Sequence, residues 1–192
     1  MAYWFHNRRF VQCCRAMAIV CLLTLATAGR ASAQQIRSGE YNIKAAFIYN
    51  FTRFIEWPDS AFATPQSPFI VGVIGPDPFG PRLEAVMNGE TVKGRPIRIK
   101  RFTSISQADE CHIVFVSGKA RTDVKKLSEV LRGKPILTVS DKPDFDQEGG
   151  MISLSMAENK IKLIINSTAA KASTLSISSK LLRLAEIKEE LP

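Results

Sequence analysis

Three short runs of residues without a single charge constrain this chain more than any other feature of its sequence. They are residues 69–75 (FIVGVIG), 111–117 (CHIVFVS) and 135–140 (PILTVS). Runs of strand length that are apolar throughout, rather than at alternate positions, are typical of strands covered on both faces in a parallel sheet. A parallel sheet needs helices to connect its strands and cover its faces, so we expect an α/β protein.

Helix signals between these runs agree with that expectation. One predicted helix covers residues 77–87, with Asp77 as its N-cap, and another covers residues 121–131. Residues 96–102 alternate between apolar and charged side chains, which predicts a strand nearer an edge of the sheet. The pattern predicts a mostly parallel sheet flanked by helices in three layers, as in Rossmann and flavodoxin-like folds.

The last part of the chain has a different pattern. Residues 151–156 and 160–166 predict two strands of a β-hairpin. Residues 168–187 predict a long C-terminal helix, because apolar side chains recur there at helical spacing. Residues 189–192 are expected to be a short solvated tail.

The first predicted helix of the domain, residues 41–57, has an unusually wide apolar face. On a helix of 3.6 residues per turn, its apolar side chains cover an arc of roughly 160°, compared with about 100° for an ordinary surface helix. Such a face fits either a helix deep in the core or a helix that also serves a subunit interface. The candidate interface residues are Phe47, Phe51, Phe54, Ile55 and Trp57.

Residues 1–33 have the pattern of a cleavable secretion signal. Several arginines precede an apolar stretch at residues 17–28, and Ala31-Ser32-Ala33 supplies the small residues that signal peptidase needs. The apolar stretch is shorter than the ~20 residues that a membrane span requires. We therefore expect cleavage after Ala33 and export to the periplasm, which leaves a single domain at residues 34–188.

Removal of this segment changes the charge of the protein. The whole chain has 26 basic and 18 acidic residues, a formal net charge of +8. Four arginines lie in the first 33 residues, so the exported part keeps 22 basic residues against 18 acidic ones, a net charge of +4. This modest excess argues against a nucleic-acid partner.

Cys111 and His112 are the only cysteine and histidine beyond residue 33. An internal disulfide in the exported domain is therefore excluded, and we expect Cys111 to be a buried free thiol. Neighbours on a strand point to opposite faces, so the two cannot form a nucleophile–base pair, and His112 is expected to be structural. Two such ligands cannot complete a four-ligand zinc site.

The remaining candidate sites follow the predicted strands. Ligands of open parallel sheets bind outside the carboxyl ends of the strands, and basic side chains there favour an anion. The candidate ligand-binding residues are Asp77, Ser117, Gly118, Lys119 and Arg121. The acidic residues between 141 and 148 lack the spacing of an EF-hand loop and are interpreted as a solvated loop. A carboxylate pair of Asp77 with Asp141 would be the basis of an enzyme, the least favoured hypothesis.

Several short motifs in a fixed order carry a family resemblance. They are residues 44–51 (KAAFIYNF), 54–58 (FIEWP), 75–79 (GPDPF), 111–116 (CHIVFV), 137–141 (LTVSD), 149–152 (GGMI), 164–166 (IIN) and 178–185 (SSKLLRLA). In this order and spacing, the chain resembles the YfiR family of periplasmic proteins across almost all of the exported sequence.

The resemblance implies a non-enzymatic regulator without a cofactor or metal. Members are periplasmic repressors that engage the sensor domain of an inner-membrane diguanylate cyclase, which lowers cyclic-di-GMP synthesis and biofilm formation. It also implies an α/β fold and a homodimer. Members often carry a partner cysteine in the first strand, but here that strand reads Val71-Gly72-Val73, so redox sensing through Cys111 is in doubt. The alternative hypothesis is a periplasmic module that binds a small molecule or anion.

Overall fold

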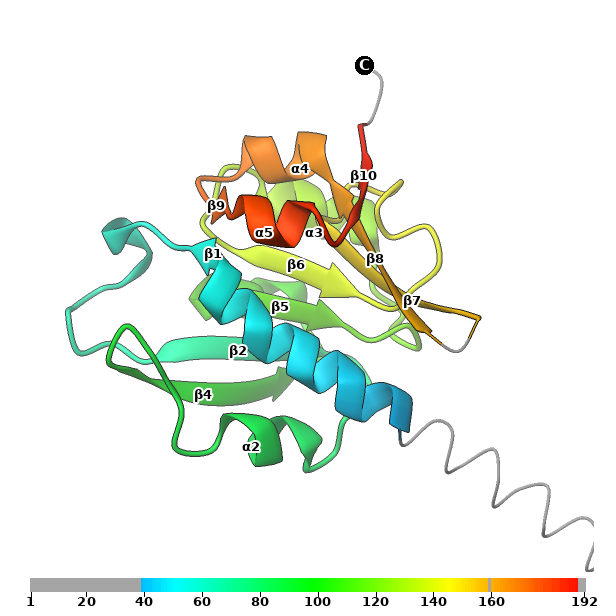
Figure 1. Ribbon diagram of the computed structural model, residues 1–192. Helices are drawn as coiled ribbons and strands as arrows, with labels where there is room; N and C mark the ends of the chain where they lie inside the picture. The colour runs from blue at the N-terminus through cyan, green and yellow to red at the C-terminus, as the bar shows by residue number, and fades with distance from the viewer. Residues whose placement is uncertain (1–38, 159, 190–192) are drawn as a thin grey trace, which may run out of the picture. The chain divides into compact units, whose positions relative to one another are not determined.

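The computed structural model describes residues 39–158 and 160–189, so the predicted signal peptide lies outside the described residues. From Glu40 onward these residues belong to one compact unit. Its framework is an eight-stranded sheet of order β10-β8-β7-β6-β5-β2-β4-β3 (Figure 1). The strands are β2 (Phe69–Ile74), β3 (Thr91–Val92), β4 (Arg95–Phe102), β5 (Ile113–Val116), β6 (Leu137–Ser140), β7 (Ile152–Ala157), β8 (Lys160–Asn166) and β10 (Glu186–Lys188).

The centre of the sheet is parallel, as the sequence predicts. β2 pairs in parallel with β4 and β5, and β6 pairs in parallel with β5 and β7. Every residue of β5 and β6 is buried, which agrees with their continuous apolar pattern. β4 has only the two-residue β3 beyond it and alternates in burial. β7 and β8 form the predicted antiparallel hairpin.

Short helices and a second, two-stranded sheet surround this framework. The first helix covers residues 39–54 and is followed by α2 (Arg82–Met87), α3 (Val124–Leu131), α4 (Ser167–Ala172) and α5 (Ser179–Leu182). Two 3₁₀ turns, η1 (Asp59–Ala61) and η2 (Ile105–Glu110), and the paired strands β1 (Ile55–Glu56) and β9 (Ser176–Ile177) complete the described residues. Within this part of the chain, no helix combines the length and apolarity that crossing a membrane requires.

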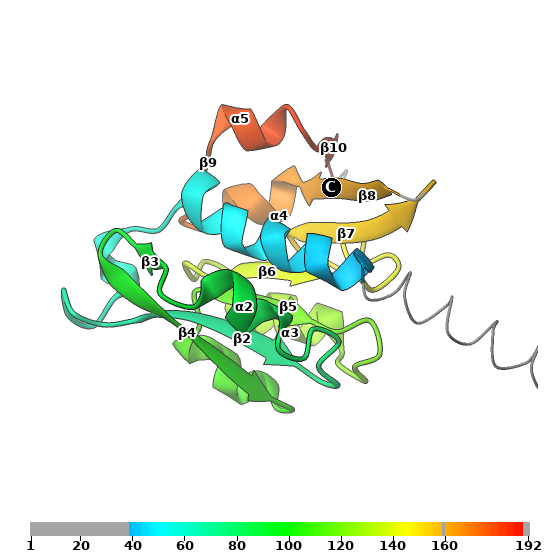
Figure 2. The ribbon, with the colours of Figure 1, turned by 60° about the horizontal axis from the view of Figure 1, so that its bottom comes forward.

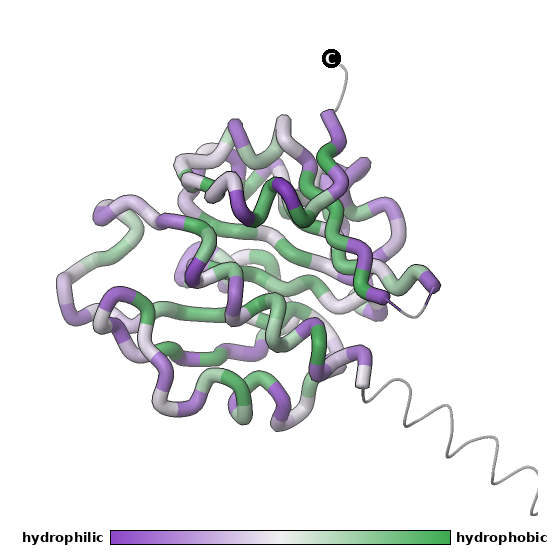
Figure 3. Tube along the Cα trace, viewed as in Figure 1, coloured by the Kyte–Doolittle hydropathy of each residue, from purple (hydrophilic) through white to green (hydrophobic). Residues whose placement is uncertain are grey.

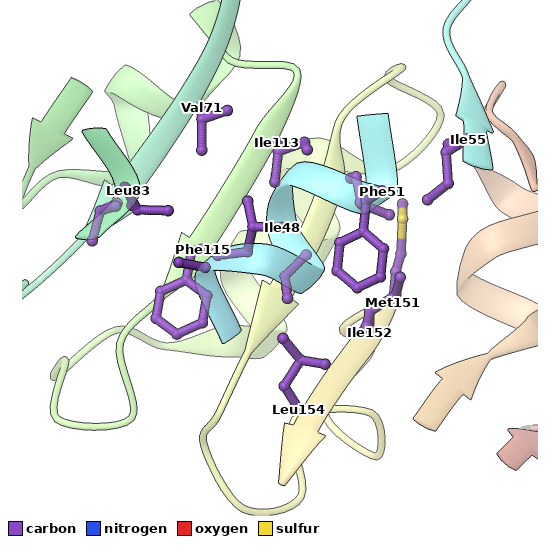
Figure 4. Close-up of a cluster of buried hydrophobic side chains, with 14 of the residues drawn as sticks. Ile48, Phe51, Ile55, Val71, Leu83, Ile113, Phe115, Met151, Ile152 and Leu154 are labelled. Carbon is purple, nitrogen blue, oxygen red and sulfur yellow. The ribbon is translucent and has the colours of Figure 1, made fainter. Parts of the chain in front are cut away.

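Two apolar clusters pack on opposite faces of the sheet, one beneath the first helix and one beneath α3 (Figure 2). Figure 4 shows Ile48 and Phe51 of the first helix among Ile113, Ile152 and Leu154 of the sheet. Apolar residues follow the central strands, whereas hydrophilic residues gather in the turns (Figure 3). Helices on both faces confirm the α/β class.

The structure does not show the regular alternation of strands and helices that is typical of a Rossmann-type fold. β6 and β7 are parallel neighbours, yet residues 141–151 join them through turns without a helix. In the chain, both α2 and β3 come between β2 and β4, which are parallel neighbours in the sheet. The fold is therefore a mixed α/β sheet with irregular connections.

The prediction of a long helix at residues 168–187 is wrong, because this segment forms α4, β9, α5 and β10. Ser173 Oγ donates to the Ala170 carbonyl at 2.7 Å and accepts the Leu175 N–H at 3.3 Å, while Ser178 caps α5. Such side-chain bonds to the local backbone compete with helical hydrogen bonds. Pairing of β9 with β1 and of β10 with β8 then favours extended backbone.

Three other predicted helices are shorter than expected. The helix predicted for residues 121–131 begins at Val124, after its N-cap Asp123. The helix predicted for residues 77–87 begins only at Arg82, since Asp77 accepts the Phe79 N–H at 2.8 Å in a turn. Gly80 has φ of 56°, in the left-handed region that a continuing helix excludes. The first helix ends at residue 54 instead of 57, because β1 pairs with β9 immediately after it.

His112 is held as a neutral imidazole. Its Nδ1 accepts the Ile70 N–H at 3.0 Å, and its Nε2 lies 3.1 Å from the Ala61 carbonyl, so Nε2 carries the proton. The ring stacks against Phe62 and Phe69, with centroids 4.4 and 4.7 Å away. Burial lowers the pKa of His112 below its usual value, outweighing its bonds to backbone.

This arrangement predicts a pH dependence of stability. The unfolded chain takes up a proton at His112 near pH 6.5, whereas the folded chain does so only at lower pH. The free energy of unfolding is therefore expected to fall as the pH decreases from about 7 to about 5, by up to about 1.4 kcal/mol per pH unit. Urea unfolding followed by the fluorescence of the buried Trp57 measures it.

A His112→Gln variant is the control, because an amide also accepts and donates but does not titrate in this range. We expect the variant to show a flatter dependence on pH than the parent chain. Equal slopes in the two proteins would contradict a neutral His112.

Candidate functional site

The carboxyl ends of β2, β5 and β6 lie side by side at one edge of the sheet. The strand registers place Ile74, Val116 and Ser140 next to one another. Residues that follow these three positions therefore share the edge at which parallel sheets bind ligands. A buried cluster of charges and an open groove are both found at this edge.

The buried cluster, here called the Lys44 cluster, comprises Glu40, Tyr41, Lys44, Gly118 and Asp141. Lys44 is only 2% exposed, and its Nζ lies 2.9 Å from Asp141 Oδ2 and 2.5 Å from Glu40 Oε1. The Tyr41 hydroxyl donates to Asp141 Oδ2 at 2.6 Å, and the Gly118 N–H donates to Oδ1 at 2.7 Å. Both carboxylate oxygens of Asp141 are therefore bonded, and the ammonium is paired twice.

The local sequence explains how this cluster assembles. Glu40 and Lys44 stand four residues apart, so they meet on the surface of the first helix. Tyr41 packs edge-on against Phe79, at a centroid distance of 5.5 Å, which directs its hydroxyl into the cluster. A Cβ at Gly118 would lie 3.0 Å from Asp141 Oδ1, so a glycine lets the backbone approach the carboxylate.

The cluster holds the first helix against the ends of β5 and β6. A lysine is almost never fully buried unless it is paired. The two ion-pair partners of Lys44 are both carboxylates. The charges are saturated by each other, whereas a general acid or base needs a proton that it can exchange with a substrate. The arrangement is that of a structural anchor.

An open groove of about 1060 Å³ lies against the ends of β2, β4 and β5. Its lining residues are 75–76, 103–106, Asp109, 119–123, Lys126 and Val130. Lys119 and Arg121, two of the predicted ligand-binding residues, belong to this lining. Ser117 is buried with its Oγ near the Lys119 N–H, and Gly118 bonds to Asp141. The predicted site is therefore divided between the groove and the Lys44 cluster.

Asp77, the fifth predicted ligand-binding residue, is held by Arg101 of β4. Arg101 donates to Asp77 Oδ2 and Glu84 Oε1, both at 2.7 Å, and to the Gly80 carbonyl at 3.1 Å. The hydrogen bond from Arg101 lowers the pKa of Glu84. Asp77 and Asp141 are thus bound to different cations, and no contact joins them as a carboxylate pair.

The acidic residues between 141 and 148 are also separated. Asp146 is buried, and its carboxylate is bonded by Lys188 at 3.0 Å and Ser153 at 3.1 Å. Burial opposes ionisation of Asp146, but these hydrogen bonds outweigh it and its pKa is lowered. In the part of the chain that the structure describes, no group of three His, Cys, Asp or Glu side chains is placed to hold a metal.

The candidate interface residues of the first helix contribute mostly to the core. Phe51, Ile55 and Trp57 are buried in the main apolar cluster, and Phe47 and Phe54 pack partly against it. The wide apolar face of this helix is therefore covered largely by contacts within the chain.

Cys111 is a buried free thiol, as predicted. A Cβ at Gly72 would lie 2.7 Å from its Sγ and also 2.7 Å from the Phe102 ring, so the glycine leaves room for both. Burial raises the pKa of Cys111 to about 12. The thiol is therefore neutral and unreactive at physiological pH.

The sequence gives no signal for the Lys44 cluster as a unit. Lys44 and Asp141 are 97 residues apart and only the fold brings them together. The single hint is that Asp141 directly follows a predicted buried strand, a position at which parallel sheets concentrate functional side chains.

We predict that Lys44→Met lowers the free energy of unfolding by about 3 kcal/mol, because it leaves the buried Asp141 carboxylate and the partly exposed Glu40 carboxylate without their cation. Lys134→Met is the control, since Lys134 pairs with Asp109 at an exposed site and should cost less than about 1 kcal/mol. Urea unfolding measures both. Adding Asp141→Asn to Lys44→Met should recover part of the loss, and equal effects of the two lysine variants would contradict the role of the cluster.

We also predict that Cys111 reacts with thiol reagents at about pH 8 only when the protein unfolds, because its thiol is buried and protonated. Ser106→Cys places a second thiol at an exposed position nearby and should react at once. Reaction with a chromogenic disulfide, with and without urea, measures both. Rapid labelling of Cys111 in the native protein would show that the thiol is accessible.

Comparison with protein families identifies the chain. A family model described as YfiR/HmsC-like matches residues 41–186. Comparison with curated proteins gives no match. The matched residues extend from the first helix to the start of β10 and include the whole lining of the groove. The chain belongs to the YfiR/HmsC-like family.

Proposed function

We propose that this protein is a periplasmic regulator that binds the periplasmic sensor domain of an inner-membrane diguanylate cyclase and represses it, which lowers cyclic-di-GMP synthesis. The observation that carries the proposal is the YfiR/HmsC-like match over residues 41–186, since that family points to regulators of cyclic-di-GMP signalling. The secretion signal predicted at residues 1–33 adds the compartment.

The chemistry of the described residues supports a protein that binds a partner over one that catalyses a reaction. The Cys111 thiol has a pKa of about 12, and the His112 ring bonds to backbone through both nitrogens. Nucleophilic catalysis needs an activated nucleophile within reach of a base, and neither side chain meets that condition. Lys44 and Asp141 neutralise each other.

Exposed apolar side chains indicate where a partner would bind. Leu184 is 72% exposed, and Ile43, Leu182 and Ile187 are also exposed. They belong to the first helix and to the C-terminal segment that includes α5 and β10 (Figure 1). Large exposed apolar side chains are the usual anchors of protein interfaces. We propose that the C-terminal segment around Leu184 contacts the sensor domain.

Deletion of the gene is expected to raise cellular cyclic-di-GMP, and the wild-type gene supplied in trans should restore it. Leu184→Glu should fold normally but fail to restore it, because a charge replaces an apolar anchor. Lys125→Glu, which introduces the same residue at an exposed position of α3, should restore it fully. Quantification of cyclic-di-GMP by mass spectrometry, with circular dichroism of each variant, measures these outcomes.

An unchanged cellular level of cyclic-di-GMP after a clean deletion of the gene would contradict the proposal. Co-purification with the solubilised cyclase adds a direct readout of binding. We also propose that the protein is a homodimer, as the family resemblance implies, and sedimentation of the purified chain tests it. If Leu184→Glu abolishes self-association but still binds the cyclase, the surface around Leu184 serves the homodimer and the cyclase binds elsewhere.

A further inference from the structure

Three cationic side chains line the groove without a partner. Lys119 and Arg121 follow β5, and Lys126 lies in the first turn of α3. All three side chains are exposed. In the part of the chain that the structure describes, no residue accepts a hydrogen bond from them and no carboxylate forms an ion pair with them. The groove therefore concentrates positive charge that the residues described by the structure do not neutralise.

The two carboxylates in the groove already have partners. Asp109 pairs with Lys134 at 2.9 Å. Asp123 is the N-cap of α3 and accepts the Lys126 backbone N–H at 3.1 Å. Asp123 keeps its negative charge, because a backbone N–H does not neutralise it, but the three cations outnumber it and attraction to an anion is the electrostatic consequence.

The groove also has hydroxyl and apolar walls. Thr103, Ser106 and Thr122 offer hydroxyl groups, which hydrogen-bond readily to oxyanions. Pro76, Ile105, Ala120 and Val130 form an apolar wall. A volume of about 1060 Å³ is ample for a small organic molecule and far exceeds the needs of a simple ion.

We propose that this groove binds a phosphate ester whose organic part is apolar or aromatic. Lys119, Arg121 and Lys126 hold the phosphate, Arg121 by the paired N–H groups that suit two phosphate oxygens. The organic part packs against the apolar wall. Lys126 and Val130 of the groove lining belong to α3, which packs on the face of the sheet opposite the first helix (Figure 2).

Phenyl phosphate is the probe, because it combines the two chemical features in the smallest molecule. Titration followed by amide chemical shifts should show saturable binding at millimolar concentration, with shifts at Gly75 and at residues 119–123. Higher salt should weaken binding, since exposed charges are screened. Phenol, which lacks the phosphate, should not bind.

Paired variants separate a defined site from diffuse charge. Arg121→Gln and Lys126→Gln should each weaken binding by about tenfold or more, because each removes one charged contact with the phosphate. Lys125→Gln changes the preceding residue of the same helix, which is exposed but does not line the groove, and should leave binding within about twofold of wild type. Unchanged urea-unfolding midpoints show that all variants are folded.

Vesicles identify the source of the phosphate. Phosphatidylglycerol vesicles that bind the wild type but not Lys126→Gln, and that phenyl phosphate displaces, assign the groove to a lipid headgroup. Phenyl phosphate binding without vesicle binding assigns it to a soluble phosphate ester. Absence of binding to both probes, or equal losses in Lys125→Gln and Lys126→Gln, would overturn the proposal.

Discussion

The ion pair between Lys44 and Asp141 is the interaction on which the arrangement of this fold depends. It joins the first helix to the residue that follows the central strand β6, and the Tyr41 hydroxyl and the Gly118 N–H complete the shell around the carboxylate. Apolar packing alone is tolerant of small shifts, because it is non-directional. The buried charges are not tolerant, since any displacement would leave an ion unpaired in a medium of low polarity.

This constraint determines what the rest of the chain presents to solvent. With Lys44 held at the carboxyl edge, the helix lies across the sheet and buries Ile48 and Phe51 in the main core. Most of the wide apolar face is thereby covered by contacts within the chain, although Ile43 stays exposed. Exposed apolar anchors are instead concentrated in the C-terminal segment around Leu184, which is why the proposed partner surface is placed there.

The sequence predicts the sheet well and the irregular parts poorly, for physical reasons. Residues 69–75, 111–117 and 135–140 identify buried parallel strands, because continuous apolarity has few other solutions in a short segment. Residues 168–187 have helical spacing of apolar residues, but Ser173 bonds to nearby backbone at the end of α4, and Ser178 caps the start of a separate helix, α5. The decisive pairings of β9 with β1 and of β10 with β8 connect distant segments and have no local signature.

The same reasoning explains which of the predicted site residues the fold brings together and which it separates. Position after a parallel strand correctly indicates the edge where Lys119 and Arg121 line a groove. Position alone does not distinguish Lys119 and Arg121 from Asp77, which is bound by Arg101, or from Gly118, which bonds to Asp141. Partners that are distant in sequence decide which polar side chains remain free, and neither composition nor periodicity carries that information.

The groove and the first helix are nevertheless closely connected. Lys119 follows Gly118 in the chain, the Gly118 N–H bonds to Asp141, and Asp141 pairs with Lys44. One peptide bond and two polar contacts therefore link the groove on one face to the helix on the other. The loop that carries Lys119 into the groove is therefore also the loop that positions the Gly118 N–H, and the Lys44 cluster depends on that position because its ions are buried.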